Sequence, residues 1–275
     1  MLGLLIDDGR CTLETRAADV VPALRRTYPD VTLRHFATMT SGYRAMGDEP
    51  SGGYMHGPSS TPFDPNPEPL FRPPGSQFSY WDSAMNEFAH VLTRVAGEPL
   101  KELFRRRFAE PMGMAGARWD WGDFGAVDGV IVTCGSGNHE GHVKISAPEL
   151  ARLGQLFLND GVWNGRRLLS RQWVRQATSV QVPASLPWAE PHCSIDGRGV
   201  YGLNWWVNGS GAHGLRKWPS APAGTFAASG YNNNKCFVVP EWGMVIVRLG
   251  LDGNIPDDAW DGFFGRLARG VRTSA

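Results

Sequence analysis

The chain has 275 residues, of which 42% are hydrophobic and 20% are charged, a composition typical of a globular protein with a sizeable core. Its 27 basic and 27 acidic side chains cancel, which argues against nucleic acid or an anionic membrane surface as the main partner. No apolar run approaches the roughly 20 residues of a membrane-spanning helix, and the start at Met1–Asp8 lacks the basic residues of a signal peptide. The compartment and the oligomeric state stay open.

The cysteines and histidines predict neither a metal site nor a cofactor. The four cysteines form no C-x-x-C pair, so scattered buried thiols are a better interpretation than a disulfide framework. His139 and His142 form an H-x-x-H pair, but the glycines around them cannot hold both rings on one helical face. In contrast, 34 glycines and 20 prolines predict many shaped loops, which is where sites are usually built on a rigid scaffold.

The first quarter of the chain predicts short helices followed by one long loop. Leu2–Ile6 has the pattern of the end of an apolar helix, with Gly9 where a left-handed residue would close it. Thr12–Val21 and Leu33–Thr38 are short helical candidates. A loop rich in glycine and proline then occupies residues 41–75, and loops of this length are usually functional or mobile.

The middle of the chain carries the strongest helical patterns. Apolar residues recur at helical spacing over Ser83–Phe108, and Gly97–Pro99 divides the run into two helices. The basic cluster Arg105–Arg107 is interpreted as a solvated helix face rather than a phosphate site. Two more predicted helices are Pro148–Asn159 and Leu168–Ala177, and residues 178–199 are again loop-like.

The first of these later helices has a specific signal at its start. Ser146 is a plausible N-cap, and Glu149 follows it at the spacing of a capping box.

From Tyr201 the pattern changes to short β-prone runs separated by glycine, asparagine and proline, which predicts antiparallel strands. The predicted strands are Tyr201–Val207, Thr225–Ala228, Lys235–Val239 and Met244–Leu249. A final helix is predicted over Pro256–Val271. Its apolar face consists of Trp260, Phe263, Phe264, Leu267 and Val271.

Helices followed by strands with a covering helix predict an α+β architecture. We expect a single domain over residues 1–275, with a mostly helical, loop-rich part at 1–199 and antiparallel strands with the last helix at 200–275.

Tyr80 and Asp82 form a candidate site just before the long helix. A tyrosine on a turn, with a carboxylate two positions later, can present a phenol and an acid at one opening. If a nearby cation kept the phenol partly ionised, the phenol could exchange protons with a serine nucleophile and with a leaving group. The alternative is an ordinary helix start, with Tyr80 packed and Asp82 capping the helix. Taken alone, these two residues favour the alternative.

Short motifs along almost the whole chain nevertheless occur in the order of one known family. They are Gly3–Arg10, Val31–His35, Thr40–Gly42, Pro74–Gly75, Phe78–Tyr80, Val95–Leu100, Phe108–Met114, Leu150–Gly154, Asn164–Gly165, Tyr201–Trp206 and Ala228–Gly230. The series resembles the serine β-lactamase and penicillin-binding-protein superfamily, specifically its class C-like esterase and peptidase branch. The resemblance implies a β-lactamase/transpeptidase-like fold, in which an antiparallel sheet with flanking helices adjoins a mostly helical subdomain.

The resemblance also implies a mechanism. Members use the serine of an S-x-x-K motif to form an acyl-enzyme that water hydrolyses, and the motif lysine shares the proton transfers with the tyrosine of a Y-x-N motif. A third motif, Lys or His followed by Ser or Thr and Gly, contacts the substrate and supplies an oxyanion N–H.

Carried over, Tyr80 is the tyrosine, Asp82 stands at the asparagine position and the N–H of Tyr231 is the oxyanion donor. Trp81 is expected near the rim of the pocket, with core packing an equally good interpretation. The full set of implied site residues is Tyr80, Trp81, Asp82, Ala228, Ser229, Gly230 and Tyr231.

The S-x-x-K motif is absent, because no serine in the chain is followed by lysine three positions later. In relatives this motif lies shortly before the segment matching Gly3–Arg10. We therefore expect a truncated start, with the N-terminal strands and the beginning of the nucleophile helix missing. Tyr80 and the third-motif backbone remain, which favours truncation over a degenerate, non-catalytic paralogue that binds an acyl or peptide ligand. A fragment that does not fold stably is a third alternative.

Two further departures bear on the substrate. Asp82 replaces a neutral amide by a carboxylate, which only accepts hydrogen bonds when ionised. Ala228 removes the cation of the third motif, so less would attract the carboxylate of a β-lactam. The resemblance thus predicts a serine hydrolase of small neutral esters or amides that needs no cofactor, inactive in the chain as given.

Overall fold

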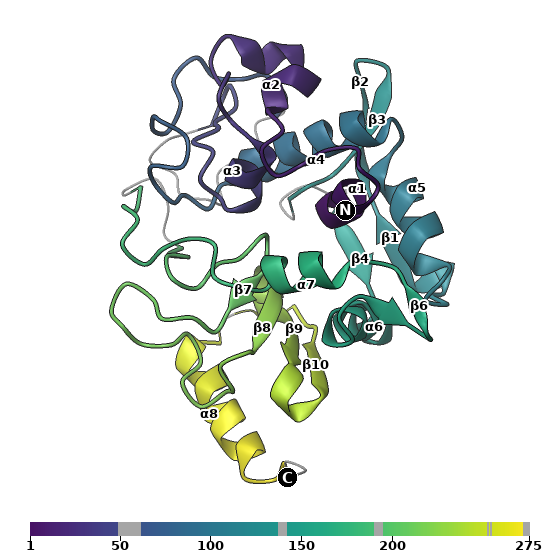
Figure 1. The fold of residues 1–275 in the computed structure, drawn as a ribbon, viewed down its shortest axis with the longest axis vertical. Helices are drawn as coiled ribbons and strands as arrows, with labels where there is room; N and C mark the ends of the chain where they lie inside the picture. Colours follow the sequence, from purple (N-terminus) through teal and green to yellow (C-terminus); the bar gives the residue numbers. More distant parts are fainter. Residues whose placement is uncertain (49–61, 137–141, 190–194, 252, 254, 272–275) are drawn as a thin grey trace. The chain divides into compact units, whose positions relative to one another are not determined.

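The computed structural model describes residues 1–48, 62–136, 142–189, 195–251, 253 and 255–271 (Figure 1). Its contacts define two compact units: residues 1–144 with 186–196, and residues 145–185 with 197–275. The first unit is mostly helical, and the second contains the largest antiparallel sheet with helices packed on it. The predicted α+β class is confirmed; the division at residues 199 and 200 stays a prediction.

The helices of the first unit pack around α4 (Asp82–Ala96), which begins one residue before the predicted start at Ser83 and ends at the predicted break after Ala96. The others are α1 (Leu2–Asp7), α2 (Ala17–Val20), α3 (Leu33–Ala37) and α5 (Leu100–Phe104), which a π-helical turn at Arg105–Ala109 continues. Phe88 of α4 stacks on Phe36 of α3 with ring centroids 5.6 Å apart. Gly97 ends α4 with a φ of 67°, a left-handed conformation that glycine adopts without strain.

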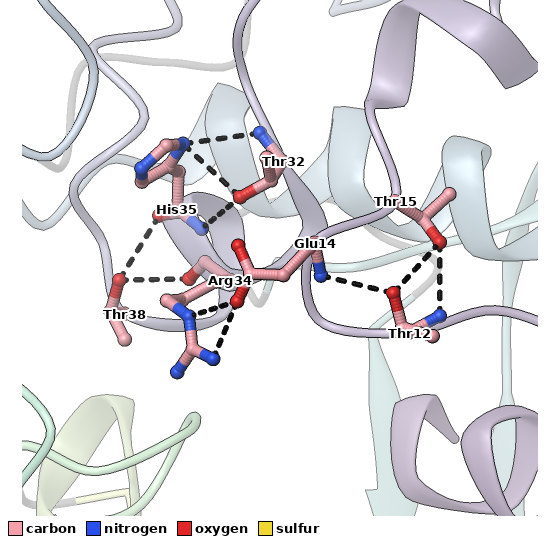
Figure 2. A network of polar contacts seen from close by, with 7 residues as sticks. All are labelled: Thr12, Glu14, Thr15, Thr32, Arg34, His35 and Thr38. Carbon is pink, nitrogen blue, oxygen red and sulfur yellow. Dashed lines mark hydrogen bonds and ion pairs between the residues drawn. The ribbon is translucent and has the colours of Figure 1, made fainter.

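The start of α3 is held by a network of polar side chains (Figure 2). Thr32 and His35 form a capping box: the Thr32 hydroxyl accepts the backbone N–H of His35, and Nδ1 of His35 accepts the N–H of Thr32 at 3.1 Å. The guanidinium of Arg34 pairs with the carboxylate of Glu14 at 2.6 Å. Since Nδ1 is an acceptor here, the proton of neutral His35 lies on Nε2.

Four short strands lie between residues 119 and 145, a stretch for which the sequence pattern predicted no element. They are β1 (Trp119–Trp121), β2 (Asp123–Val127), β3 (Val130–Thr133) and β4 (Val143–Ile145), with β1 paired to β4 and β2 to β3. Asp128 and Gly129 form the two-residue turn between β2 and β3, with φ angles of 49° and 80°. An Asp-Gly pair between apolar residues is a strong hairpin signal, and it could have located these two strands.

The second unit is built on a four-stranded antiparallel sheet in the order β10-β9-β8-β7. The strands are β7 (Trp206–Val207), β8 (Phe226–Gly230), β9 (Asn234–Val239) and β10 (Met244–Arg248). The smaller elements of this unit are β5 (Val162–Trp163), β6 (Arg166–Arg167) and α7 (Arg171–Ala177).

Helices α6 (Ala147–Leu158) and α8 (Asp257–Ala268) cover opposite faces of this sheet (Figure 1). A Cβ at Gly154 of α6 would lie 2.8 Å from Sγ of Cys236, so glycine permits the close approach of α6 to the sheet. Phe264 of α8 packs on Phe237, the residue that follows Cys236 in β9, with ring centroids 5.0 Å apart. Successive residues of a strand point to opposite faces, which places the two helices on different sides.

Ser146 is confirmed as the N-cap of α6, but the capping box predicted with Glu149 does not form, because the Ser146 hydroxyl accepts no capping hydrogen bond. Pro148 has no N–H to donate, and Glu149 pairs with Arg152 at 3.1 Å instead of reaching back. The predicted helix at Thr12–Val21 shrinks to the four residues of α2.

The predicted first strand and the predicted apolar face of the last helix also differ from the structure. Of the strand predicted at Tyr201–Val207, only β7 and an isolated bridge at Tyr201 form. Phe263 is 37% exposed, although the pattern placed it on the buried face of the last helix.

None of the described helices is long and apolar enough to cross a membrane.

Candidate active site

Tyr80 lies at the entrance to α4, directly after two residues whose backbone N–H groups are bonded to other segments of the chain. The N–H of Ser79 donates to the carbonyl of Met39 at 2.9 Å, and that of Phe78 donates to the carbonyl of Pro187 at 2.9 Å. Tyr80 is half-buried, and the chain remains extended at Trp81 before α4 begins.

The interpretation of Asp82 as the cap of α4 is wrong. Trp81 is the N-cap residue without a side-chain capping bond, and Asp82 is the first residue of the helix. Asp82 is 7% exposed, and its carboxylate at the first turn lies where the helix dipole favours a negative charge.

Trp81 is a core residue of the first unit. Its side chain is 2% exposed, and its indole Nε1 donates a hydrogen bond to Oδ2 of Asp48 at 2.9 Å. A tryptophan packed in this way contributes mainly by holding its neighbours, and its role in substrate binding stays a prediction.

The third-motif residues lie together at the end of β8. Ala228, Ser229 and Gly230 are opposite Cys236, Lys235 and Asn234 of β9. Tyr231 begins the turn between the strands, and its side chain is 62% exposed. The turn contains Asn232 and Asn233 with φ angles of 57° and 54°, a conformation that asparagine tolerates better than most residues.

Lys235 is the residue that the sequence reasoning missed. It lies directly opposite Ser229, and its Nζ donates a hydrogen bond to the Ser229 hydroxyl. Lys235 is 8% exposed, and Arg248 of β10 lies directly opposite it. Serine, lysine and arginine therefore form one row across three strands. The signal in the sequence is a lysine that follows the third motif after a short turn, which becomes informative only once the register of the hairpin is known.

Asn86 fixes a second segment beside α4. Its Oδ1 accepts the N–H groups of Gly135 and Ser136 at 3.0 and 2.9 Å. A Cβ at Gly135 would lie 2.0 Å from the carbonyl oxygen of Met85, so this segment can dock only with glycine at that position. The Gly-Ser dipeptide near Cys134 thus packs as a structural element against the helix that follows Tyr80.

Tyr80, Trp81 and Asp82 belong to the first unit, and the residues from Ala228 to Tyr231 belong to the second. That the two groups meet across one pocket stays a prediction.

Neither metal ligands nor reactive thiols are found in the part of the chain that the structure describes. No group of three or more His, Cys, Asp and Glu residues there could hold a metal ion, and His139 and Cys193 lie outside the described residues. Burial raises the pKa of the Cys11 and Cys134 thiols to about 11 and that of Cys236 to about 12, so these thiols are protonated at neutral pH.

The comparisons with known proteins identify the class of this fold. The sequence profile of the Beta-lactamase family matches residues 1–252, and the chain belongs to this family. This confirms the resemblance that the motifs predicted.

Solved structures of the same fold include hydrolases and penicillin-binding-protein homologues. A putative 6-aminohexanoate-dimer hydrolase from Bacillus anthracis has a TM-score of 0.64 and 19% identity, over 98% of this chain and 70% of that one. A penicillin-binding protein homolog from Caulobacter crescentus has a TM-score of 0.65 and 18% identity, over 98% and 79%. A family VIII carboxylesterase has a TM-score of 0.65 and 16% identity, over 97% and 79%. No curated protein sequence matches the chain.

Proposed function

We propose that the chain carries the tyrosine and third-motif parts of a serine hydrolase site that cleaves an ester or amide through an acyl-enzyme. The observation that carries this proposal is the end of β8, where Ser229 and Gly230 are retained and Ser229 is hydrogen-bonded to Lys235. Membership of the Beta-lactamase family supports it, and the carboxylesterase among the similar structures is in keeping with an ester substrate.

The residues divide the work as follows in this proposal. The phenol of Tyr80 exchanges a proton between the nucleophile and the leaving group. The N–H of Tyr231 donates to the oxyanion that forms on the carbonyl oxygen. Asp82 accepts a hydrogen bond from a cation or from a substrate N–H.

Lys235 changes the expectation about substrate charge. Ala228 removes the cation of the third motif, which by itself favours a neutral substrate. Lys235 supplies an ammonium to the same serine from the next strand, with Arg248 beside it. We therefore expect the site to accept an acyl compound that carries a carboxylate next to Ser229, because hydrogen bonds between ionised groups are about twice as strong as neutral ones.

The covalent step is not expected in the 275-residue chain itself, because S-x-x-K is absent from it. Removing such a nucleophile abolishes the covalent route, and oxyanion stabilisation recovers only a small part of the rate.

A fluorophosphonate probe, which labels activated serines, tests this. Met1–Ala275 should remain unlabelled, whereas a form extended by the codons read in frame before Met1 should be labelled at the serine of an S-x-x-K motif. Changing Tyr80→Phe in the extended form should slow the labelling. Stoichiometric labelling of Met1–Ala275 would contradict the assignment. The absence of S-x-x-K upstream would favour a ligand-binding pseudoenzyme.

A further inference from the structure

The buried carboxylate of Asp48 lies at the start of α4, where its partners Trp81 and Ser83 follow Tyr80 in the sequence, and the proposed function assigns it no role. Asp48 is 2% exposed. Its Oδ2 accepts the N–H of Ala45 at 2.8 Å and the indole N–H of Trp81 at 2.9 Å. Its Oδ1 accepts the hydroxyl of Ser83 at 2.8 Å. One carboxylate therefore joins the loop of residues 41–75 to two residues at the start of α4.

These partners are unusual for a buried acid, because all three are neutral. Transferring a carboxylate from water into the interior costs several kcal/mol, and a nearby cation commonly offsets that cost. Among the ion pairs of the described residues, none involves Asp48. The guanidinium of Arg44 donates through Nε to the backbone carbonyl of Asp48 at 3.2 Å, rather than to the carboxylate. The arrangement therefore points to a geometric role for the acid.

The geometry shows what the acid fixes. Trp81 is extended, with φ −139° and ψ 121°, and Ser83 is the second residue of α4. Two bonds from one carboxylate to residues on either side of Asp82 constrain the rotation of the first helical turn. They also constrain the peptide that follows Tyr80. The direction in which the Tyr80 phenol leaves the backbone is thereby linked to Asp48.

The loop that carries Asp48 is anchored well enough to act as a support. The phenol of Tyr43 donates to the carbonyl of Pro62 at 2.7 Å. The phenol of Tyr28 donates to the carbonyls of Arg44 and Asn66 at 3.1 and 3.0 Å. Both tyrosines are buried, so the loop is held at Arg44, before Asp48, and at Pro62 and Asn66 after it.

We propose that Asp48 is a positioning residue for Tyr80: its carboxylate holds Trp81 and Ser83 and so sets the orientation of the phenol. The catalytic value of this orientation rests on the proposed function. The orientation itself can be measured in the 275-residue chain without any activity.

The test is nuclear magnetic resonance of protein labelled at tyrosine Cζ and at the indole nitrogen. The Tyr80 and Trp81 signals are assigned with Tyr80→Phe and Trp81→Phe. Asp48→Leu keeps the branching and nearly the size of the side chain, but its methyl groups can accept none of the three hydrogen bonds. In the folded variant we expect the Trp81 indole proton to exchange at least about tenfold faster, a loss typical of a broken buried hydrogen bond. We also expect the Tyr80 signal to move toward that of the exposed Tyr231, and its titration midpoint to change.

Asp64→Leu is the matched control, because Asp64 is an exposed acid of the same loop; it should leave both signals unchanged. If Asp48→Leu does not fold, Ser83→Ala removes one of the three bonds and should still move the Tyr80 signal. A Tyr80 signal and titration that are unchanged in the folded variant overturn the proposal, even if the unfolding free energy falls. This result is independent of fluorophosphonate labelling, so its failure and that of the proposed function are distinguishable.

Discussion

Replacing Lys235 by methionine should separate the binding of charged and neutral ligands. Methionine has nearly the length of lysine and removes the ammonium that donates to Ser229. Lys235 is 8% exposed, so the ammonium has already lost most of its water, and its bond to an anion is correspondingly strong.

The magnitude follows from that burial. A hydrogen bond to a charged group contributes about 1.5–3 kcal/mol. With about 1.4 kcal/mol per factor of ten, the affinity for a carboxylate should fall by roughly 10- to 150-fold. The unfolding free energy should change by no more than about 1 kcal/mol, because the desolvation cost of a buried charge offsets much of what its bonds contribute. Affinity and stability should thus respond differently to one substitution.

The assay compares N-acetylglycine with its neutral counterpart N-acetylglycinamide. Binding is followed through the amide signals of Ser229 and Gly230 during titration of the 275-residue chain. Lys235→Met should weaken only the carboxylate, and Lys144→Met, at an exposed lysine, should weaken neither. An equal loss for both ligands, or a carboxylate that does not bind the unaltered chain, would refute the reasoning.

Two further predictions concern stability. Gly154→Ala should lower the unfolding free energy by about 1–3 kcal/mol, because the new Cβ would lie 2.6 Å from Cγ1 of Val245. Gly262→Ala in α8, where only the end of Arg266 lies near at 3.5 Å, should raise it by roughly 0.5–1 kcal/mol; equal shifts in thermal melts of the two variants would contradict the placement of α6. Burial lowers the pKa of His35, so its neutral form stabilises the fold above the unfolded pKa of about 6.5 and this stability is lost as the pH falls through the folded pKa. Urea unfolding at pH 7.5 and pH 5 should show a stability advantage of the unaltered chain over His35→Ala that shrinks on acidification, and an advantage that grows would contradict it.

Much of the fold could be predicted because its signals are local. The apolar spacing of α4 and the glycine that ends it are adjacent in the sequence, as are the strands β8 to β10 and their turns. The hairpin β2–β3 escaped the sequence reasoning although its Asp-Gly turn is a local signal. Helices and strands could thus be predicted wherever the signal for the element lies within its own segment of the sequence.

The candidate site was predictable only in part, because its supporting contacts join distant residues. Asp48 is separated from Trp81 by 33 positions and from Ser83 by 35, and no short motif marks such a pair. The contact between Ser229 and Lys235 depends on the register of a hairpin with two left-handed asparagines in its turn. Family motifs made Tyr80 and Ser229 candidates, whereas the contacts that Asp48 and Lys235 make near them are visible only in the structure.

The proposed function requires that Tyr80 and Ser229 line one pocket, and cross-linking tests this prediction most directly. A Tyr80→Cys, Ser229→Cys double variant that also carries Cys193→Ser is treated with bifunctional thiol reagents of increasing length, and single-cysteine variants serve as controls. Cys11, Cys134 and Cys236 are buried, and their raised pKa values keep them unreactive. The account predicts rapid intramolecular cross-linking by reagents that span on the order of 10 Å, the width of a small-molecule pocket. Cross-linking that requires much longer reagents, or fails with all of them, would contradict it.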